Sequence, residues 1–308
     1  MSSRRVSSST TEEGVPPDDT ITRRVFAEID SFFKSHPHIK SSHGLSHARA
    51  VWYHAARAIS CAGATPLSAT ESMEVQVAAL LHDVDDKKYF PDVATEEGGS
   101  DGSERSAAAV SSAGEEPTAT ARKTRSSLPN AGGICDAAGV PPESADRILA
   151  MIGWVSCSDN GNAVPPEVAS TGSYRMLIPR WADRLEAVGA AGVARCYRYS
   201  LETGRPLFTE ASPRARSEEE VWRLATPERF GAYLSGGGGG GDMISHYYDK
   251  LLHVARPPPE SVRNPYLERC AEGSAGVLIE VCLRFGRTGT VDEGHIRDIE
   301  MSLEDGTR

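Results

Sequence analysis

The sequence predicts an all-α fold, a bundle of packed helices. Apolar residues recur at helical spacing in one segment after another, beginning with "ITRRVFAEIDSFFKSH" at residues 21–36. No stretch shows the alternation of apolar and polar residues that is typical of a half-buried strand. The sequence also contains no internal repeat, so we expect one helical bundle and no repeat array.

The first 92 residues predict a tail followed by three helices. Residues 1–20 are rich in Ser, Thr, Glu and Pro, and we expect them to form a disordered tail. The first helix begins at Ile21, and a second is expected from about Gly44 to Ala62, because Gly63 ends it. A third should cover about residues 68–83, with Val75 and Leu80 among its inward residues.

Residues 93–127 interrupt this pattern. The segment "VATEEGGSDGSERSAAAVSSAGEEPTATARKTRSS" contains almost no large apolar residue. Burial of such a segment could not compensate for the loss of its conformational entropy. We therefore expect a disordered insertion, with order resuming near Pro141.

The second half predicts further helices. One follows the prolines at 141–142, and another runs through "IPRWADRLEAVGAAGVARCYRYSL" as a single long helix opened by Pro179. Small residues within this helix should allow a neighbouring helix to pack closely. One or two short helices are expected in 218–234, then a flexible glycine link at 236–241, and two more helices from 242 to 285. Residues 291–308 should form a C-terminal helix or tail.

Composition excludes several functions. The 308 residues carry a formal net charge of −10, so the chain lacks the long-range attraction that nucleic acids and anionic membranes require. No stretch of about eighteen apolar residues predicts a membrane span, and the N-terminus lacks the apolar core of a secretory signal. The six cysteines form no C-x-x-C pair. We expect reduced thiols and a cytoplasmic or nucleocytoplasmic location, without nucleic-acid or membrane partners.

Candidate metal ligands occur in three places. "HGLSHARAV" has His43 and His47 one helical turn apart, "LLHDVDD" has His82 and Asp83, and Asp183 lies in "PRWADRLEAVG". Imidazole with carboxylate suits a divalent ion such as Mn, Fe or Zn, and also Mg if water completes the coordination.

Three other kinds of site are not supported. The His43–His47 spacing matches the zinc-protease helix, but that motif needs Glu directly after its first His, and Gly44 stands there. No Ser lies in the G-x-S-x-G turn of a hydrolase triad. The glycine run at 236–241 lacks the Lys-Ser or Lys-Thr that completes a phosphate-binding loop.

The motifs together resemble those of a known family. His47, then His82-Asp83 after an apolar helix, then Asp183 resemble the HD-domain superfamily of metal-dependent phosphohydrolases. "AALLHDVDDKKYF", "ADRLEAVGAAGVARCY", "GRPLF" and "ISHYYDKLL" are similar, in this order, to segments of the small HD hydrolases that resemble bacterial nucleoside triphosphate pyrophosphohydrolases. The resemblance covers about residues 21–290, excluding the insertion, and implies an HD-domain helical bundle.

The resemblance also implies site residues. The metal ligands would be His47, His82, Asp83 and Asp183. Asp86 would be the general acid/base. The substrate's phosphates would be bound by Lys88 and Lys250. Arg184 is a further candidate for this role, although such an arginine is more often structural and paired to a neighbouring carboxylate. Asp85 is expected to point into solvent, and His54 and His253 to be ordinary helix residues. The sequence departs from this branch at Gly44, Arg49 and Trp181.

The function implied is a metal-dependent phosphohydrolase that cleaves a nucleoside triphosphate to monophosphate and pyrophosphate. Its cofactor would be a divalent ion such as Mn or Mg, its partner a small nucleotide or other phosphorylated molecule, and a homodimer is implied by analogy. An HD phosphomonoesterase or phosphodiesterase would use the same ligands, and a nucleotide-binding module without turnover is a third alternative.

Overall fold

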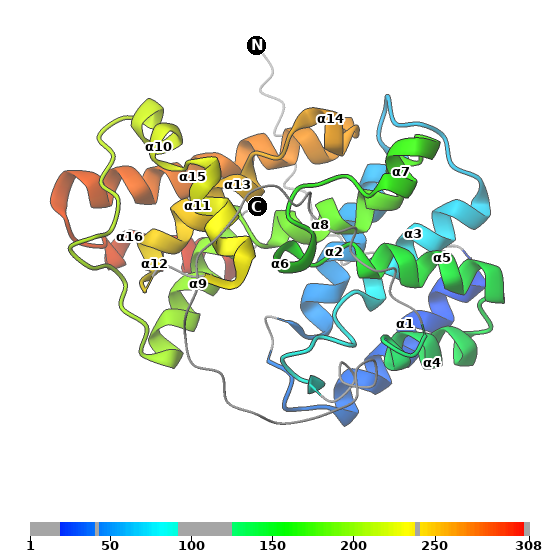
Figure 1. Cartoon of the computed structure of the whole chain (residues 1–308). Helices are drawn as coiled ribbons and strands as arrows, with labels where there is room; N and C mark the ends of the chain where they lie inside the picture. Colours follow the sequence, from blue (N-terminus) through cyan, green and yellow to red (C-terminus); the bar gives the residue numbers. More distant parts are fainter. Residues whose placement is uncertain (1–18, 41–42, 92–124, 238–240, 305–308) are drawn as a thin grey trace, which may run out of the picture.

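The computed structural model describes residues 19–40, 43–91, 125–237 and 241–304, and these residues form helices and no strand. The prediction of an all-α fold is therefore confirmed for this part of the chain (Figure 1). The first eight α-helices are α1 (Thr20–Ser35), α2 (Leu45–Ser60), α3 (Ala69–Leu81), α4 (Pro129–Ala138), α5 (Pro142–Gly153), α6 (Cys157–Asn160), α7 (Pro166–Thr171) and α8 (Ile178–Glu186), the last preceded by the 3₁₀-helix η3 (Tyr174–Leu177). The remaining helices are α9 (Gly189–Thr203), α10 (Glu218–Leu224), α11 (Pro227–Ala232), α12 (Met243–His246), α13 (Leu252–Ala255), α14 (Pro259–Val262), α15 (Pro265–Thr288) and α16 (Glu293–Glu304), with the π-helical turns η4 (Tyr233–Gly237) and η5 (Tyr247–Leu251).

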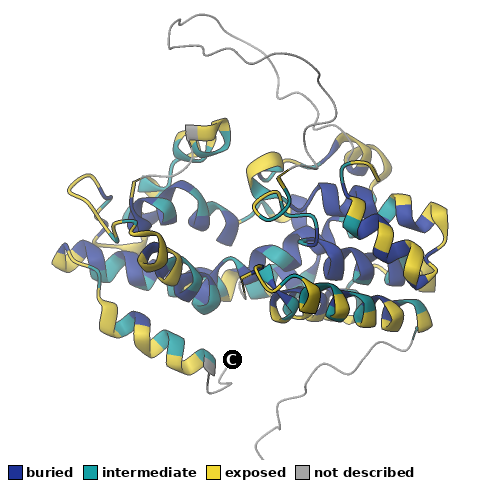
Figure 2. Cartoon of the chain, turned by 90° about the horizontal axis from the view of Figure 1, so that it is seen from below, coloured by how far each residue is buried: buried dark blue, intermediate teal, exposed yellow. Residues whose placement is uncertain are grey.

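A first hydrophobic core joins the N-terminal helices. Val51 of α2, Leu80 and Leu81 of α3, and Ile148 of α5 are completely buried in it. Each leucine or isoleucine removed from water contributes about 1.5–3 kcal/mol. Figure 2 shows this pattern as buried inner faces and exposed outer faces on the same helices.

A second hydrophobic core joins the C-terminal helices. It contains Val193 of α9, Val221 of α10, Tyr247 of η5 and Phe285 of α15. The long helix α15 connects the two cores, because its first turns, including Leu267, belong to the first core and its later turns to the second.

Local sequence explains where α3 begins. The side chain of Ser68 accepts a hydrogen bond from the backbone N–H of Glu71, and the Glu71 carboxylate accepts one from the backbone N–H of Ser68. This reciprocal capping satisfies two backbone donors that a helix start leaves without a partner. The predicted start at residue 68 therefore agrees with the structure.

The predicted single helix from Pro179 to Leu201 is wrong, because it breaks into α8 and α9. Val188 is extended, with φ −126° and ψ −176°, and Gly189 takes a positive φ of 65°. A side chain at Gly192 would lie 2.3 Å from the backbone oxygen of Ala187, so the turn requires glycine there. The expectation of close packing holds at Gly189, where a Cβ would lie 3.2 Å from Ser274 of α15.

Order resumes earlier than predicted, with α4 before Pro141. This helix has Gly132 and Gly133 in its middle, which lower its intrinsic helix propensity. Its start is capped from a distant part of the chain, because the carboxylate of Asp85 accepts hydrogen bonds from the backbone N–H groups of Asn130 (2.9 Å) and Ala131 (2.8 Å). The prediction that Asp85 points into solvent is therefore wrong.

Most of the predicted tail, most of the 93–127 insertion and part of the glycine link lie outside the described residues. The short helices expected in 218–234 are α10 and α11, and the C-terminal segment contains α16. All six cysteines carry free thiols, as predicted. None of the helices in the described ranges has both the length and the apolar character needed to cross a membrane.

Candidate metal centre

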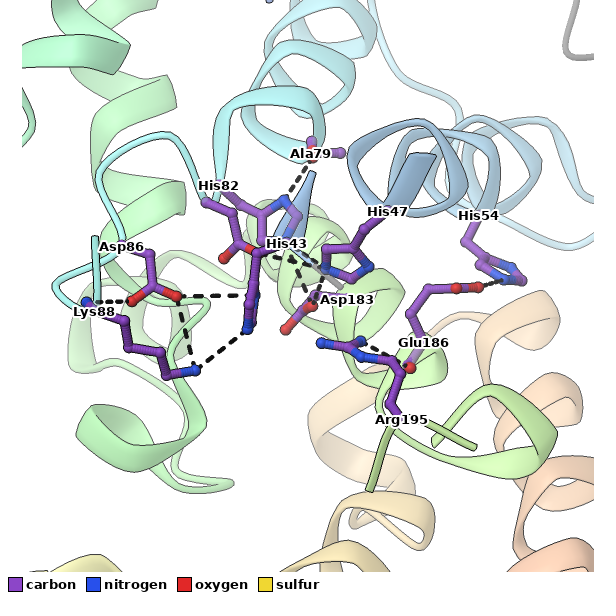
Figure 3. Close-up of polar contacts among 11 residues, drawn as sticks. His43, His47, His54, Ala79, His82, Asp86, Lys88, Asp183, Glu186 and Arg195 are labelled. Carbon is purple, nitrogen blue, oxygen red and sulfur yellow. Dashed lines mark hydrogen bonds and ion pairs between the residues drawn. The ribbon is translucent and has the colours of Figure 1, made fainter. Parts of the chain in front are cut away.

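Three helices of the first core bring four predicted ligands together. His47 lies in the first turn of α2, Asp183 lies in α8, and His82 and Asp83 follow directly after the last residue of α3. Because α3 ends at Leu81, the chain can turn both side chains toward one point (Figure 3). The apolar residues before His82 are completely buried and fix the end of this helix.

The ligand atoms of these residues are closely spaced. Nε2 of His47 lies 3.2 Å from Nε2 of His82 and 3.3 Å from Oδ1 of Asp183. Nε2 of His82 lies 3.4 Å from Oδ2 of Asp83 and 3.5 Å from Oδ1 of Asp183. Oδ2 of Asp83 is 3.5 Å from Nε2 of His47. The ligand atoms of His47, His82 and Asp83 thus converge on one small volume, and Oδ1 of Asp183 lies against both imidazoles.

This spacing fits one divalent ion. Transition metals such as Zn bind nitrogen and oxygen at about 2.0–2.2 Å, which places neighbouring ligand atoms roughly 2.8–3.1 Å apart in octahedral geometry and roughly 3.3–3.6 Å apart in tetrahedral geometry. The observed separations of 3.2–3.5 Å are close to the tetrahedral values. Two imidazoles and two carboxylates also form a donor set that suits Mn, Fe or Zn.

A backbone contact orients His82 for ligation. Its Nδ1 lies 2.9 Å from the carbonyl oxygen of Ala79, which can accept a hydrogen bond only from a protonated nitrogen. In a neutral ring the proton is therefore on Nδ1, and the lone pair of Nε2 points into the cluster. The side chain of His82 is 1% exposed, whereas that of Asp183 is 25% exposed, so the cluster is more open on the Asp183 side.

Electrostatics within the cluster favour opposite charges. Burial would lower the pKa of His82, but the charge of Asp83 and hydrogen bonds with Asp183 and Asp83 outweigh it, and the pKa lies well above its usual value. Burial would raise the pKa of Asp183, but hydrogen bonds with His47 and His82 hold it well below its usual value. A metal ion that binds Nε2 of His82 must displace the proton that the charged imidazole carries there. Metal binding should therefore strengthen as pH rises.

A second group of side chains adjoins the cluster. Nδ1 of His43 lies 2.9 Å from Oδ2 of Asp83 and 3.8 Å from Oδ2 of Asp86. Nζ of Lys88 lies 3.4 Å from Nε2 of His43 and 3.8 Å from Oδ2 of Asp86. The structure therefore brings Asp86 and Lys88, both predicted site residues, to the edge of the metal cluster.

The resemblance assigned no role to His43, but the structure places its side chain against the candidate ligands. Its ring holds the carboxylate of Asp83 and lies between the ligands and the Asp86–Lys88 pair. The signal in the sequence was its position four residues before His47. His43 lies just before the N-cap of α2, and its ring centroid is 6.2 Å from that of His47. Gly44, where the resembling proteins have Asp, is the N-cap residue of α2 and has no side chain to offer.

Two predicted substrate residues lie elsewhere. Lys250, in η5, stacks over the ring of Tyr233 at 5.1 Å, and none of the contacts described for it involves the cluster. Arg184 is buried, and its guanidinium donates to Asn162 and to the carbonyl of Gly161. These contacts favour the structural role for Arg184. The contacts of neither residue support binding of the substrate's phosphates.

The other two departures from the family pattern have different surroundings. Trp181 is buried in α8, donates from Nε1 to the carbonyl of Ser261 at 3.2 Å, and lies under the guanidinium of Arg184. Arg49 is exposed on α2. Trp181 thus contributes to packing beneath α8 and not to the cluster of ligands.

His54 is more than an ordinary helix residue. Its Nε2 lies 3.1 Å from Oε1 of Glu186, and its Nδ1 lies 2.8 Å from the hydroxyl of Tyr266. Glu186 is one turn beyond Asp183 on α8, and its backbone oxygen accepts a hydrogen bond from Nη1 of Arg195 at 3.1 Å. This network ties α2, α8, α9 and α15 together beside the ligands, and its His54, Glu186 and Arg195 are visible at the right of Figure 3.

Comparison with known proteins finds a relative in sequence and similarity in fold to solved structures. No family model matches the chain. A crystal structure of a Lactobacillus plantarum protein, a Northeast Structural Genomics target, matches with a TM-score of 0.52 and 21% identity, covering 85% of this chain and 95% of that one. This match concerns the fold alone.

The sequence relative is much closer. The mimivirus protein described as "Uncharacterized protein L803", from Acanthamoeba polyphaga mimivirus, is 33% identical over 248 residues, which cover 80% of this chain and 90% of that protein. Identity at this level, over most of both chains, indicates common descent. The chain belongs to the same protein family as this mimivirus protein.

Proposed function

We propose that the chain is a metal-dependent phosphohydrolase of the HD type, with its HD domain spanning residues 21–290. Its substrate would be a nucleoside triphosphate, cleaved to a monophosphate and pyrophosphate. One observation carries the proposal: the ligand atoms of His47, His82 and Asp83 converge at separations of 3.2–3.5 Å, and Oδ1 of Asp183 lies within 3.5 Å of both imidazoles. These are the residues that the resemblance to HD phosphohydrolases selects as ligands.

The metal would supply Lewis acidity, polarising a phosphoryl oxygen and lowering the pKa of water. The residues at its edge would supply the remaining functions. The carboxylate of Asp86 adjoins His43 and Lys88 but is not among the four convergent ligands, so it is free to accept and return a proton. Lys88 is exposed and would neutralise charge that develops on the phosphate.

Product analysis tests this proposal. Purified protein loaded with manganese would be incubated with a panel of ribonucleoside and deoxyribonucleoside triphosphates, monophosphates and cyclic nucleotides. We expect equal amounts of monophosphate and pyrophosphate from triphosphates, as resolved by chromatography. The matched control is Asp83→Ala, which removes one ligand and should release neither product.

Other outcomes point to the alternatives. Orthophosphate without pyrophosphate at early times would indicate a phosphomonoesterase, and cleavage of a cyclic nucleotide would indicate a phosphodiesterase. Binding of metal and nucleotide with no product from any member of the panel would indicate a binding module without turnover. Absence of metal binding would contradict the proposal in all its forms.

A further inference from the structure

We infer that Arg195 binds a phosphoryl group of the substrate, on the side of the metal centre opposite Lys88. The inference rests on the proposed function, because it assigns a second cationic contact to the same site. It concerns a residue of α9, whose position depends on the break between α8 and α9.

The first support is the place at which Arg195 is held. Its Nη1 donates to the backbone oxygen of Glu186 at 3.1 Å. Glu186 follows Asp183 by three residues in α8, a helical rise of about 4.5 Å. The guanidinium is therefore anchored about one helical turn from a candidate ligand. A straight helix from 178 to 203 would have carried Arg195 about three turns away from Asp183.

The second support is the hydrogen-bonding capacity that this contact leaves unused. A guanidinium has five N–H donors. The carbonyl of Glu186 takes one of them, and no carboxylate among the described residues is within 4.0 Å of the others. Arg180 of α8 differs because it is buried: it donates to the carbonyls of Trp154 and Ala163, and its unpaired Nη2 is also buried within the fold. Arg195 is half-buried, so a ligand can reach it.

The third support is direction. In Figure 3 the guanidinium of Arg195 lies between Glu186 and Asp183, with its free end turned toward the metal cluster. The same view places Lys88 on the far side, where its Nζ is 3.8 Å from Oδ2 of Asp86. The cluster of ligands thus lies between one cation from the Asp86 side and another from the Asp183 side.

The chemistry of this arrangement suits a chain of phosphates. The protein carries a net charge of −10, so an anionic substrate must be held by local cations. A guanidinium presents a planar fork that matches two oxygens of one phosphate, whereas the ammonium of a lysine acts as a point charge. We therefore assign the bidentate contact to Arg195 and the outer contact to Lys88.

Binding of inorganic tripolyphosphate to the manganese-loaded protein tests the inference by calorimetry, without any need for turnover. Arg195→Gln should weaken this binding by roughly tenfold to a hundredfold, the loss expected for hydrogen bonds to a charged group. Arg195→Lys should recover part of it. The matched control is Arg198→Gln, one turn further along α9, where Arg198 is exposed and pairs with Glu300 at 2.6 Å. This control should bind like the unaltered protein.

Manganese content and melting temperature would be measured on the same samples. Unchanged tripolyphosphate binding by Arg195→Gln would overturn the inference and leave the proposed function intact. Loss of manganese in the same proportion as tripolyphosphate would show that Arg195 only braces α8 against α9, and would also overturn it. An unaltered protein that binds neither manganese nor tripolyphosphate would contradict the proposed function itself.

Discussion

The two hydrophobic cores bury histidines in opposite ways. In the first core, His47 and His82 face the carboxylates of Asp83 and Asp183 at 3.3–3.5 Å. In the second core, Nδ1 of His246 is buried without a hydrogen-bond partner. Burial lowers the pKa of His246 to about 3, whereas partners raise that of His82.

This difference shows that a displaced pKa alone does not identify a functional site. Burial lowers the pKa of His246 by as much as many active sites shift the pKa values of their catalytic groups. The group in the first core differs because charges of both signs converge there from three helices. Convergence of ligand atoms, and not burial, is therefore the property that assigns function to one core.

The largest expected effect is on stabilisation by manganese, and it is tested by replacing one histidine of each core with alanine. His82→Ala removes a candidate ligand, so added manganese should no longer raise the melting temperature. His246→Ala removes a buried histidine of the second core and should keep the whole manganese-induced shift. Thermal unfolding with and without manganese compares them. A shift that persists in His82→Ala at low manganese would remove His82 from the set of ligands.

The next effect separates two neighbouring carboxylates of the first core. Asp86→Asn should retain manganese but lose about a hundredfold or more in turnover, the usual scale for a general acid/base. Asp83→Ala should lose both. Metal analysis and steady-state kinetics on the same preparations provide the measurement. If Asp86→Asn loses manganese as fully as Asp83→Ala, Asp86 is a ligand instead.

Removal of the metal should affect the first core more than the second. An ion at a hundredfold excess over its dissociation constant stabilises the fold by about 2.7 kcal/mol, which corresponds to a melting shift of roughly 4–5 °C for a protein of this size. Treatment with a chelator should therefore lower the melting temperature by this amount. Hydrogen exchange should increase in α2, α3 and α8 more than in α16, and a uniform increase would contradict the assignment of the site.

Acid should act on the second core through His246. The folded protein keeps this imidazole neutral, because its pKa is about 3, while the unfolded chain binds a proton below about pH 6.5. The free energy of unfolding should therefore fall with pH from about 6.5 toward 3, and His246 accounts for about 2 kcal/mol of this loss at pH 5.

In His246→Leu, the decrease in unfolding free energy between pH 7 and pH 5 should be smaller by this amount, as measured by denaturant titration at both values. The same decrease in both proteins would show that His246 is protonated in the fold.

The smallest effect concerns Asp85, the neighbour of Asp86. Its carboxylate caps α4, so Asp85→Ala should cost about 1 kcal/mol of stability and leave turnover unchanged. Melting curves and kinetics test this together. A loss of turnover comparable to that of Asp86→Asn would show that Asp85 takes part in the reaction.

The sequence predicted those features that depend on neighbours along the chain. The helical spacing before His82 and the start of this helix near residue 68 depend on local sequence, and both agree with the structure. The resemblance to HD phosphohydrolases selected four residues, of which the structure brings His47, His82 and Asp83 together and places Asp183 against both histidines. The bend after α8 was missed because continuous helical spacing on both sides concealed one extended residue, Val188.

Other features depend on residues that are distant in the sequence. The cap of α4 comes from Asp85, which is 45 positions before Asn130, so the composition of α4 alone gives no indication of it. Arg195 comes near the ligands only because the chain turns at Val188 and Gly189. Such contacts require the three-dimensional arrangement.

The helix α15 has a consequence for how the protein is made. The first core consists mainly of residues before Ala187, but Val262, Leu267 and Ala271 complete it. A ribosome delivers these three residues only after the preceding 261 residues have been synthesised. We therefore expect the nascent N-terminal helices to keep part of their apolar surface exposed until α15 has emerged, so that the metal-ligand helices reach their final packing only after that point.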